Sequence, residues 1–445
     1  METKDLFIKS LLEKDKKLLY EILDEIYPID IAIILEEIEE DLLLVFCQMM
    51  DKKRLAEVIE QSELTLQKSI LEHFSMSDII EIFSYMSNDD IADIIGELPF
   101  QLRKDILRYM NKSESNEIEH LLGYAPDTAG GIMTTEYLAL KGDLTVQEAI
   151  VKIKQIGPRT EVLDVIFVLD KAKRLVGTVE LRDILIADER STLYDIMNDN
   201  VISTYPDEPQ DIVSQLVSKY DLTVIPVINR RGALLGIITV DDIIDVIVEE
   251  HTEDLLGLGG VSKEERVHST LSDSVKKRLP WLIVNLATAF LGSLVISSFE
   301  EIISQVVVLA AIMPIIAALG GNSGSQSLSV VIRALTLGEL DLKEDWTLIS
   351  KQLFIGLITG LSVGSTAGLI IFLRYKNIYL SLIVILAMTG SLIIGSIFGF
   401  LIPVILKSLG IDPALASSIF LTAITDVSGF FVFLGLAKLF MPFLL

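Results

Sequence analysis

One carboxylate lies near the middle of a long apolar segment at the C-terminal end of the chain. Between Pro413 and Ala437, Asp426 is the only side chain that is ionisable at neutral pH. A charge near the bilayer centre costs roughly 2.5 to 3.5 kcal/mol on insertion scales, so it should face protein or water rather than lipid. Ser418 and Thr422 precede Asp426 at intervals of four residues, which places all three on one helix face. A functional role is the first hypothesis for this acid.

A second polar cluster interrupts another apolar run. The run covers residues 302–332 and contains Pro314, followed by GGNSGSQSLS at 320–329. Its length and its glycines predict that it is not one plain helix, and such breaks are tolerated at membrane depth where they line a cavity or pack against protein. If helix resumes after the two glycines, three polar side chains share one face: Asn322, Ser325 and Gln326. Two polar faces together indicate one aqueous path.

Each polar feature also has a purely structural explanation. Small residues let transmembrane helices approach closely, and Asn or Gln can bond between helices, so GGNSGSQ could serve packing alone. Asp426 could form a buried ion pair, with Arg333 the best partner by depth, or could be a hydrogen-bonded carboxyl that is kept neutral. Both alternatives stay open on the sequence alone.

The donor atoms on the two faces limit what could pass along such a path. They are carboxylate, amide and hydroxyl oxygens without Cys or His, a set that suits hard cations such as Mg²⁺ or Ca²⁺. Mg²⁺ sheds water reluctantly, so one carboxylate with polar groups around it could hold a hydrated ion. An apolar substrate would need none of these groups.

The charge distribution divides the chain into two unlike halves. Residues 1–274 contain 27 Lys and Arg against 55 Asp and Glu, whereas residues 275–445 contain 10 against 8. The first half has the spaced apolar positions of a soluble protein, and the second has long uncharged runs. The single cysteine, Cys47, excludes an intramolecular disulfide and fits a reducing compartment. We expect a membrane protein with a large acidic cytosolic extension.

Five uncharged runs meet the requirement of roughly 20 residues for a helix that crosses a bilayer. They are residues 280–299, 302–332, 352–373, 377–406 and 413–437. The flanking basic residues fall mostly on one side, with Lys276, Lys277, Arg278, Arg333, Lys343, Lys351 and Lys407 there against Arg374, Lys376 and Lys438 opposite. The positive-inside rule therefore places the N-terminal half in the cytosol and Leu445 outside.

An internal repeat lies in the acidic half. VIFVLDKAKRLVGTVELRDIL at 165–185 and VIPVINRRGALLGIITVDDII at 224–244 align without gaps at an offset of 59 residues. Each predicts two strands around a turn, followed by a helix. The repeat resembles a tandem pair of cystathionine-β-synthase-type (CBS) domains over about residues 132–250, and this resemblance implies a module that dimerises and senses small ligands.

The segments on either side of the repeat are helical in pattern. Before it, apolar spacing predicts a stack of short antiparallel helices, with Ser87 of SNDD as one helix cap. After it, a charged connector is interrupted at Gly259 and Gly260. The expected domains are a cytosolic N domain at 1–127, the CBS pair at 128–250, a connecting helix at 251–278 and a transmembrane domain at 279–445. The predicted fold class is a multidomain membrane protein with an all-α five-helix membrane domain, an α-helical N domain and an α/β CBS module.

Four motifs, in order, resemble one family, the MgtE magnesium channels. They are AGGIMTTEY at 129–137, TVDDIIDV at 239–246, GGNSGSQSLSVVIRAL at 320–335 and DPALASSIFLTAITDVSG at 412–429. The resemblance covers nearly the whole chain. It implies Mg²⁺-selective uptake across the plasma membrane by a multi-pass homodimer surrounded by membrane lipid. Neither an enzymatic activity nor a nucleic-acid partner is expected.

The resemblance also implies roles for particular residues. In a pore between two subunits, Asp426 from each chain would select the ion and Asn322 would line the path, with Ser325, Gln326 and Thr422 as further pore-lining candidates. Cytosolic Mg²⁺ sites that hold the pore shut would match Asp89, Asp93, Asp221, Asp242, Asp245, Glu250, Glu253, Asp254 and Asp412. Mg²⁺ would thus be substrate and regulatory ligand, while ATP at the CBS pair stays an open question. Ser325 stands where the family often has a second Asn, and His251 lies within the acidic connector.

Charge alone supports a cation sensor in the acidic half. Residues 1–274 carry a formal net charge of −28, so their carboxylates can approach one another only if cations neutralise them. For any single carboxylate, a merely solvated acidic surface is the alternative.

Two other functional classes are weaker on the sequence. An ion-coupled secondary transporter would also use an intramembrane Asp, but the five spans show no inverted repeat. A membrane-tethered enzyme regulated by the CBS pair lacks a catalytic motif, because GxxxxGK[ST], HExxH and GxSxG are absent and the four histidines are scattered.

Overall fold

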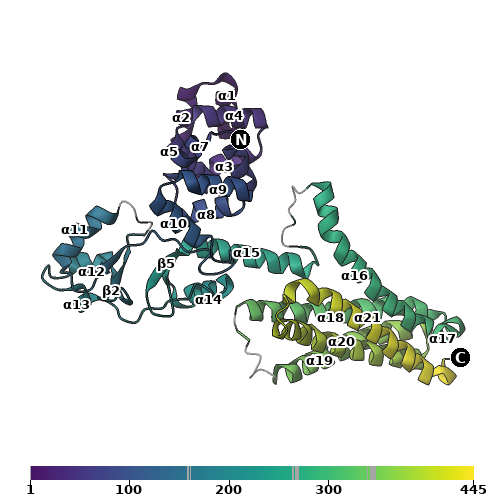
Figure 1. Cartoon of the computed structure of the whole chain (residues 1–445). Coiled ribbons are helices and arrows are strands. Elements are labelled where there is room, and N and C mark those ends of the chain that lie inside the picture. Colours follow the sequence, from purple (N-terminus) through teal and green to yellow (C-terminus); the bar gives the residue numbers. More distant parts are fainter. Residues whose placement is uncertain are drawn as a thin grey trace. The chain divides into compact units, whose positions relative to one another are not determined.

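The computed structural model describes residues 2–157, 160, 162–262, 265, 270–337, 339–340 and 347–444. It contains two compact units, Met1–Val246 and Ile247–Leu445, each of which is described by itself (Figure 1). Lys343 and His268, both used in the sequence arguments, lie outside the described residues. The expected fold class is confirmed, because the chain has a helical N domain, a CBS pair and five apolar candidate membrane helices.

Short helices build the N-terminal part of the first unit. They are α1 Glu2–Glu13, α2 Lys16–Leu23, α3 Pro28–Glu36, α4 Glu40–Met49, α5 Lys52–Glu60, α6 Leu64–Leu71, α7 Met76–Phe83, α8 Asn88–Gly96, α9 Phe100–Tyr109 and α10 Lys112–Leu121. Ser87 caps α8 as predicted, because its hydroxyl accepts a hydrogen bond from the backbone N–H of Asp90.

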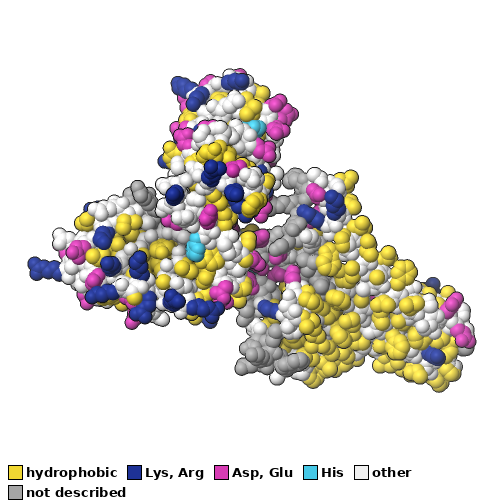
Figure 2. All heavy atoms as spheres, in the orientation of Figure 1, with side chains coloured by type: hydrophobic (Ala, Val, Ile, Leu, Met, Phe, Trp, Pro, Cys, Tyr) yellow, Lys and Arg dark blue, Asp and Glu magenta, His cyan; other side chains and the backbone are white. Residues whose placement is uncertain are grey.

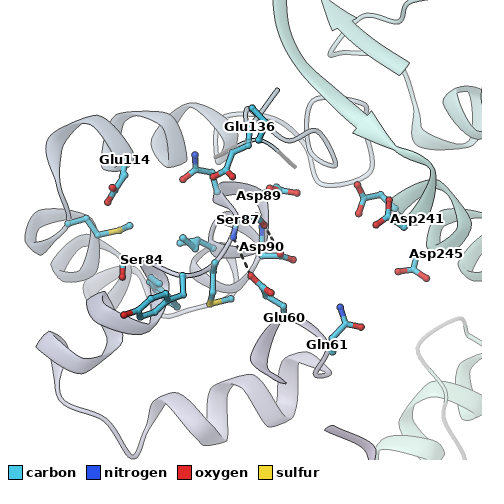
Figure 3. A pocket seen from close by; sticks show the side chains of 18 of the residues that line it. Glu60, Gln61, Ser84, Ser87, Asp89, Asp90, Glu114, Glu136, Asp241 and Asp245 are labelled. Carbon is cyan, nitrogen blue, oxygen red and sulfur yellow. Dashed lines mark hydrogen bonds between the residues drawn. The ribbon is translucent and has the colours of Figure 1, made fainter. Parts of the chain in front are cut away.

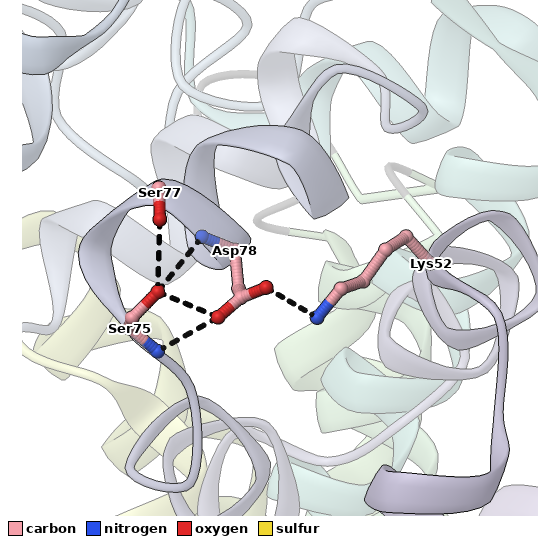
Figure 4. Close-up of polar contacts among 4 residues, drawn as sticks. All are labelled: Lys52, Ser75, Ser77 and Asp78. Atoms are coloured by element: carbon pink, nitrogen blue, oxygen red, sulfur yellow. Dashed lines mark hydrogen bonds and ion pairs between the residues drawn. The ribbon is translucent and has the colours of Figure 1, made fainter.

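Polar contacts at the start of α7 show how these helices are held together (Figure 4). Ser75 and Asp78 form a reciprocal capping box. Asp78 also forms an ion pair with Lys52 of α5, with 2.9 Å between Nζ of Lys52 and Oδ1 of Asp78. The Lys52 ammonium lies 3.9 Å from the ring centroid of Phe74. One lysine therefore ties α5 to the start of α7.

The CBS pair follows as two similar hairpins with flanking helices. Its elements are β1 Ala139–Lys141, α11 Val146–Ile156, β2 Val165–Leu169, β3 Leu175–Glu180, α12 Leu181–Ile186, α13 Leu193–Ile196, α14 Gln210–Tyr220, β4 Val224–Ile228, β5 Leu234–Thr239 and α15 Val240–Leu258. β2 pairs antiparallel with β3, β4 pairs antiparallel with β5, and β1 runs parallel to β2. Both hairpins carry a register shift at the same place, at Val168/Leu169 and at Val227/Ile228, which confirms the repeat at its offset of 59.

The second unit contains the long apolar helices. They are α16 Leu271–Ser297, α18 Val308–Thr336, α19 Thr347–Tyr375, α20 Ile378–Ser408 and α21 Pro413–Leu439, with the short helix α17 Glu300–Gln305 before α18 and a 3₁₀ turn at Met441–Phe443. Five helices among the described residues are long and apolar enough to cross a membrane, one in each expected run. Hydrophobic side chains cover most of the visible face of this unit (Figure 2).

The expected break within GGNSGSQSLS was wrong. α18 is continuous from Val308 through Pro314 to Thr336, and the 302–332 run is divided earlier, between α17 and α18. Packing explains the continuity, because the glycines that cost helix propensity sit where other helices cross closely. A Cβ on Gly320 would meet Ser391 of α20, and one on Gly324 would meet Leu421 of α21.

The α19–α20 contact uses small residues in the same way. Gly356, Gly360, Gly364 and Gly368 recur every four residues along α19, and a Cβ on any of them would press on α20. In the centre of the unit, Ser323 of α18 and Ser396 of α20 share a hydrogen bond of 3.0 Å between their hydroxyls. Together these contacts fix α18, α19 and α20 relative to one another.

Substitution of Gly395 should test this packing. A Cβ there would overlap the carbonyl oxygen of Gly320, so Gly395→Val should destabilise the membrane unit by about 1 to 3 kcal/mol through overpacking. The measurement is the thermal unfolding midpoint of the purified protein in detergent. Gly435→Val is the matched control, since a Cβ at Gly435 has no neighbour within 4 Å among the described residues. Equal midpoints for the two variants would contradict the packing role.

Candidate ion pathway and acidic cleft

The predicted polar face of α18 points away from the protein interior. Asn322, Ser325 and Gln326 are exposed, whereas Gly324 and Leu328 on the other side of the helix are buried. A polar face on the outside of a membrane unit is costly in lipid, so protein or water must cover it. The helical geometry thus bears out that the three polar residues share one face.

α21 brings its own polar residues beside this face. α18 and α21 come close at Gly321, where a Cβ would lie 3.9 Å from Oγ1 of Thr425. Asn322 and Asp426 are the next residues along the two helices from this contact. Thr422 is exposed and its hydroxyl donates to the carbonyl of Ser418 at 2.9 Å, while Asp426 is half-buried. α18 and α21 therefore present the two predicted polar stripes next to each other.

Asp426 lacks the partner that would make it purely structural. Within the residues that the structure describes, its carboxylate forms neither a salt bridge nor a hydrogen bond, and Arg333 is exposed without contacting it. The ion-pair alternative is therefore not what the structure contains. An intramembrane acid without a protein partner is the kind that an ion or water must satisfy.

The first unit holds an acidic cleft of about 1090 Å³ (Figure 3). Carboxylates reach it from α5, α8, α10 and α15 and from the segment before β1, and none of the described lining residues is Lys, Arg or His. Figure 3 shows Asp89, Asp90 and Glu60 on one wall and Asp241 and Asp245 on the other. The acidic lining residues are Glu60, Asp89, Asp90, Glu114, Glu136, Asp241, Asp242 and Asp245.

Burial and mutual repulsion raise the pKa values of acids in and beside this cleft. For Glu60, Asp93 and Glu136 the pKa is about 7, because burial disfavours the charged form and neighbouring carboxylates add to that effect. The pKa of Asp90 and of Asp242 is about 6 for the same two reasons. Hydroxyls partly offset the shift, since Ser87 donates to Asp90 at 2.5 Å and Thr239 to Asp242 at 2.7 Å.

The carboxylates are gathered but not yet arranged as a coordination site. Among the described residues, no group of three or more His, Cys, Asp or Glu is placed to hold a metal ion. A cation that bound here through several carboxylates would therefore have to draw them together. Repulsion between the acids, which adds to the effect of burial on their pKa values, opposes that approach without a cation.

The structure gathers only some of the acids expected in the cytosolic half. Asp89, Asp242 and Asp245 line the cleft, and Asp93 is close enough that Asp89, Asp90 and Asp242 raise its pKa. Asp221 is elsewhere: it ends α14 in a left-handed conformation, with φ of 52°, and is exposed.

Sequence reasoning missed five acids of the cleft. Asp90 and Asp241 could have been found, because each is the neighbour of a predicted ligand in an Asp-Asp pair. Glu60, Glu114 and Glu136 had no such signal, since tertiary folding alone brings them to the cleft. A hydrogen bond connects Glu60 to the start of α8, because the backbone N–H of Ser87 donates to its carboxylate at 3.3 Å.

Two of the remaining acids, Asp254 and Asp412, lie close together in the second unit. Asp254, near the end of α15, accepts a hydrogen bond of 2.6 Å from Thr336, the last residue of α18. Burial raises the pKa of Asp254, and Asp412 raises it further, whereas His251 and Lys407 lower it. Asp412 also caps α21 by accepting from the backbone N–H of Ala414 at 2.8 Å. Asp254 and Asp412 are thus neighbours, and Glu250 and Glu253 precede Asp254 on α15.

Family models match three parts of the chain. A model described as a divalent cation transporter, MgtE, matches residues 313–436, and the MgtE intracellular N domain matches residues 26–127. The CBS domain model matches twice, at 129–190 and 193–249. The matches follow the order helical domain, CBS pair and membrane helices.

Relatives and solved structures agree with these matches. The chain is 35% identical over 74% of its length to the magnesium transporter MgtE of Enterococcus faecalis, covering 73% of that protein. It is also 35% identical over 73% of its length to the Thermus thermophilus transporter of the same name, covering 72% of it. The cytosolic domain of the Mg²⁺ channel MgtE, solved in complex with ATP, covers 55% of this chain and 99% of its own, at 33% identity and a TM-score of 0.52. The chain belongs to the MgtE family of magnesium transporters, a transporter family and not an enzyme family.

Proposed function

We propose that the protein conducts Mg²⁺ into the cytosol across the cell membrane and closes when Mg²⁺ occupies its acidic soluble part. The observation that carries the proposal is the exposed polar face of α18 beside the unpaired Asp426, inside a unit of five apolar helices. The soluble half lies in the cytosol and Leu445 outside, an orientation supported by the basic residues on one side of the spans.

The pore lies between two copies of the chain. One carboxylate per chain is a sparse site for a divalent ion, whereas two Asp426 side chains across a twofold axis provide two charges. Asn322, Ser325, Gln326 and Thr422 then contact the ion through its water shell, which suits Mg²⁺ because it dehydrates reluctantly. A second copy also covers the exposed polar face, so the same contact removes the cost of that face in lipid.

Closure comes from cation binding to the acids of the first unit. Asp89, Asp93, Asp242 and Asp245 bind Mg²⁺ together with the cleft acids beside them, and Asp221 is a further, separate ligand position. Binding shifts the population toward whichever arrangement holds the carboxylates closest, by as much as the affinities of the two states differ. When the Mg²⁺ concentration is low, the acids repel one another, and this repulsion favours the open state.

The acids of the second unit act at the membrane side of the sensor. Asp254 and Asp412 lie next to each other, with Glu250 and Glu253 preceding on α15. Mg²⁺ bound here connects the last turns of α15 to the end of α18, at Thr336, and to the start of α21, at Asp412.

ATP binding at the CBS pair is a further part of the proposal. It is supported by the similar cytosolic domain that was solved in complex with ATP. The nucleotide would then be a second regulatory ligand beside Mg²⁺.

Removal of the pore carboxylate should abolish transport. Asp426→Ala should reduce Mg²⁺ flux into liposomes to background while leaving a folded protein, because the site loses its only charge in each chain. Glu301→Ala, which removes an acid of the same unit outside both polar stripes, is the control and should conduct normally. Normal flux through Asp426→Ala would contradict the pore assignment. If Mg²⁺ flux through the parent protein depended on a proton gradient and had the slow rate of a carrier, a coupled transporter would be favoured.

Neutralising the sensor should weaken inhibition by cytosolic Mg²⁺. The combined variant Asp242→Asn, Asp245→Asn and Glu253→Gln should keep a high open probability at Mg²⁺ concentrations that close the parent. With fewer carboxylates, Mg²⁺ binds the closed arrangement less tightly and stabilises it less. Single-channel recording on excised patches measures it.

A variant with the same charge change at exposed acids outside both clusters controls for net charge: Glu119→Gln, Asp143→Asn and Glu189→Gln. Equal Mg²⁺ inhibition of all three proteins would remove these residues from the sensor.

The cleft should also show a characteristic pH dependence without Mg²⁺. Glu60, Asp93 and Glu136 hold protons in the folded unit up to pH about 7, whereas their ordinary pKa values are 4.5, 3.8 and 4.5. The folded state thus binds more protons between pH about 4 and 7, so its stability falls as pH rises through that window. Hydrogen exchange of the full chain should show α8 losing protection toward pH 8 and regaining it when Mg²⁺ is added.

The double variant Glu60→Gln and Asp93→Asn should flatten this response, because it removes two of the shifted groups. Protection of α8 that is independent of both pH and Mg²⁺ in the parent protein would contradict cation binding in the cleft.

A further inference from the structure

α16 packs against α21 and buries one small residue there, while Ile296 near its end is partly buried against the hydrophobic core. Gly292 is the only residue of this helix that is buried among the described residues, while Leu282, Leu286 and Leu294 are each more than half exposed. Gly292 is therefore the point on α16 where the helix lies closest to the interior of the unit.

The close approach lies beside Asp426 and Phe430 of α21. A Cβ on Gly292 would lie 4.0 Å from Cβ of Asp426 and 3.5 Å from the ring of Phe430, one turn further along α21. Asp426 thus has α18 on one side, through the Gly321–Thr425 contact, and α16 on another. At position 292 α16 has no side chain to fill the space beside the carboxylate.

The same face of α16 carries polar groups toward its start. Thr288 and Asn285 precede Gly292 by four and seven residues, which places them on its face. Thr288 is half-buried and Asn285 is exposed. α16 and α21 are the first and fifth spans and so cross in the same direction, which puts Thr288 and Asn285 at the depths of Thr422 and Ser418. A third polar stripe thus runs beside the two on α18 and α21.

We propose that α16 is a third wall of the ion pathway and that Gly292 is a specificity-determining residue, which leaves room beside Asp426 for an ion that keeps its water shell. The proposal rests on the proposed function, because it takes Asp426 as the ion site. A Mg²⁺ ion with its six waters is about 7 Å across, given Mg–O distances of 2.0 to 2.1 Å and a water radius of 1.4 Å. A side chain at 292 would begin 4.0 Å from Cβ of Asp426 and would take up part of the space beside this residue.

The test is a size series at one position, Gly292→Ala, Gly292→Val and Gly292→Leu, in liposomes that contain the purified full chain. Mg²⁺ flux should fall in that order, by about tenfold for Val. The flux ratio of Ca²⁺ to Mg²⁺ should rise along the series, because Ca²⁺ gives up water more readily than Mg²⁺ and suffers less from a narrower path. A purely structural role would lower both fluxes in proportion to the amount of folded protein and leave the ratio unchanged, which would overturn the proposal.

Two further variants keep the test decisive if bulky residues at 292 impair folding. Thr288→Val preserves shape and removes only the hydroxyl, so it should also raise the Ca²⁺ to Mg²⁺ ratio, and an unchanged ratio counts against the third wall. Ala287→Leu adds bulk to an exposed position on another face of α16 and should conduct like the parent.

Asp426→Ala in the same vesicles separates this proposal from the pore assignment. If Asp426→Ala is silent while the Gly292 series conducts with the parent's rate and ratio, only the inference about α16 fails. If Asp426→Ala conducts, the pore assignment itself fails.

Discussion

A polar surface cannot face the hydrocarbon of a bilayer without cover, and the membrane unit is organised around that constraint. Its glycines bring α18, α20 and α21 into close contact on one side, so the amide and hydroxyl groups of α18 are left on the other. Asp426 stands beside this surface without a basic partner among the described residues. One face of α18 therefore packs against α20 and α21, and this packing fixes the orientation of the polar residues on its opposite face.

Repulsion between like charges is the corresponding constraint in the soluble unit. Eight acids line one cleft whose described lining has no basic residue, and burial and repulsion raise the pKa values of Glu60, Asp93 and Glu136, in or beside that cleft, to about 7. The helices that supply them are held by caps and apolar packing, as at Ser75 and Ser87, rather than by pairing the acids with lysine or arginine. A fold built this way keeps its acids close together without a basic residue in the described lining, as the proposed cation sensor requires.

Sequence reasoning predicted the features that depend on local pattern. The five apolar spans, the CBS repeat with its equivalent hairpins and the helix cap at Ser87 all follow from periodicity and residue type over short stretches. It failed where the outcome depends on distant neighbours. The glycines of α18 predict a break by propensity, but contacts with Ser391 and Leu421 favour an unbroken helix. Glu60 joins the cleft from α5, far from α8 in sequence, and no local pattern marks it.

The hydrogen bond between Thr336 and Asp254 has a mechanical consequence within the second unit. Thr336 is the last residue of α18, and Asn322 lies fourteen residues earlier on the same unbroken helix, about 21 Å away at 1.5 Å per residue. One continuous helix therefore connects the hydrogen bond to Asp254 with the polar face of α18. In the proposed channel, a change at Asp254 would reach the wall of the ion path by displacement of α18 along its axis, without a hinge between the two points.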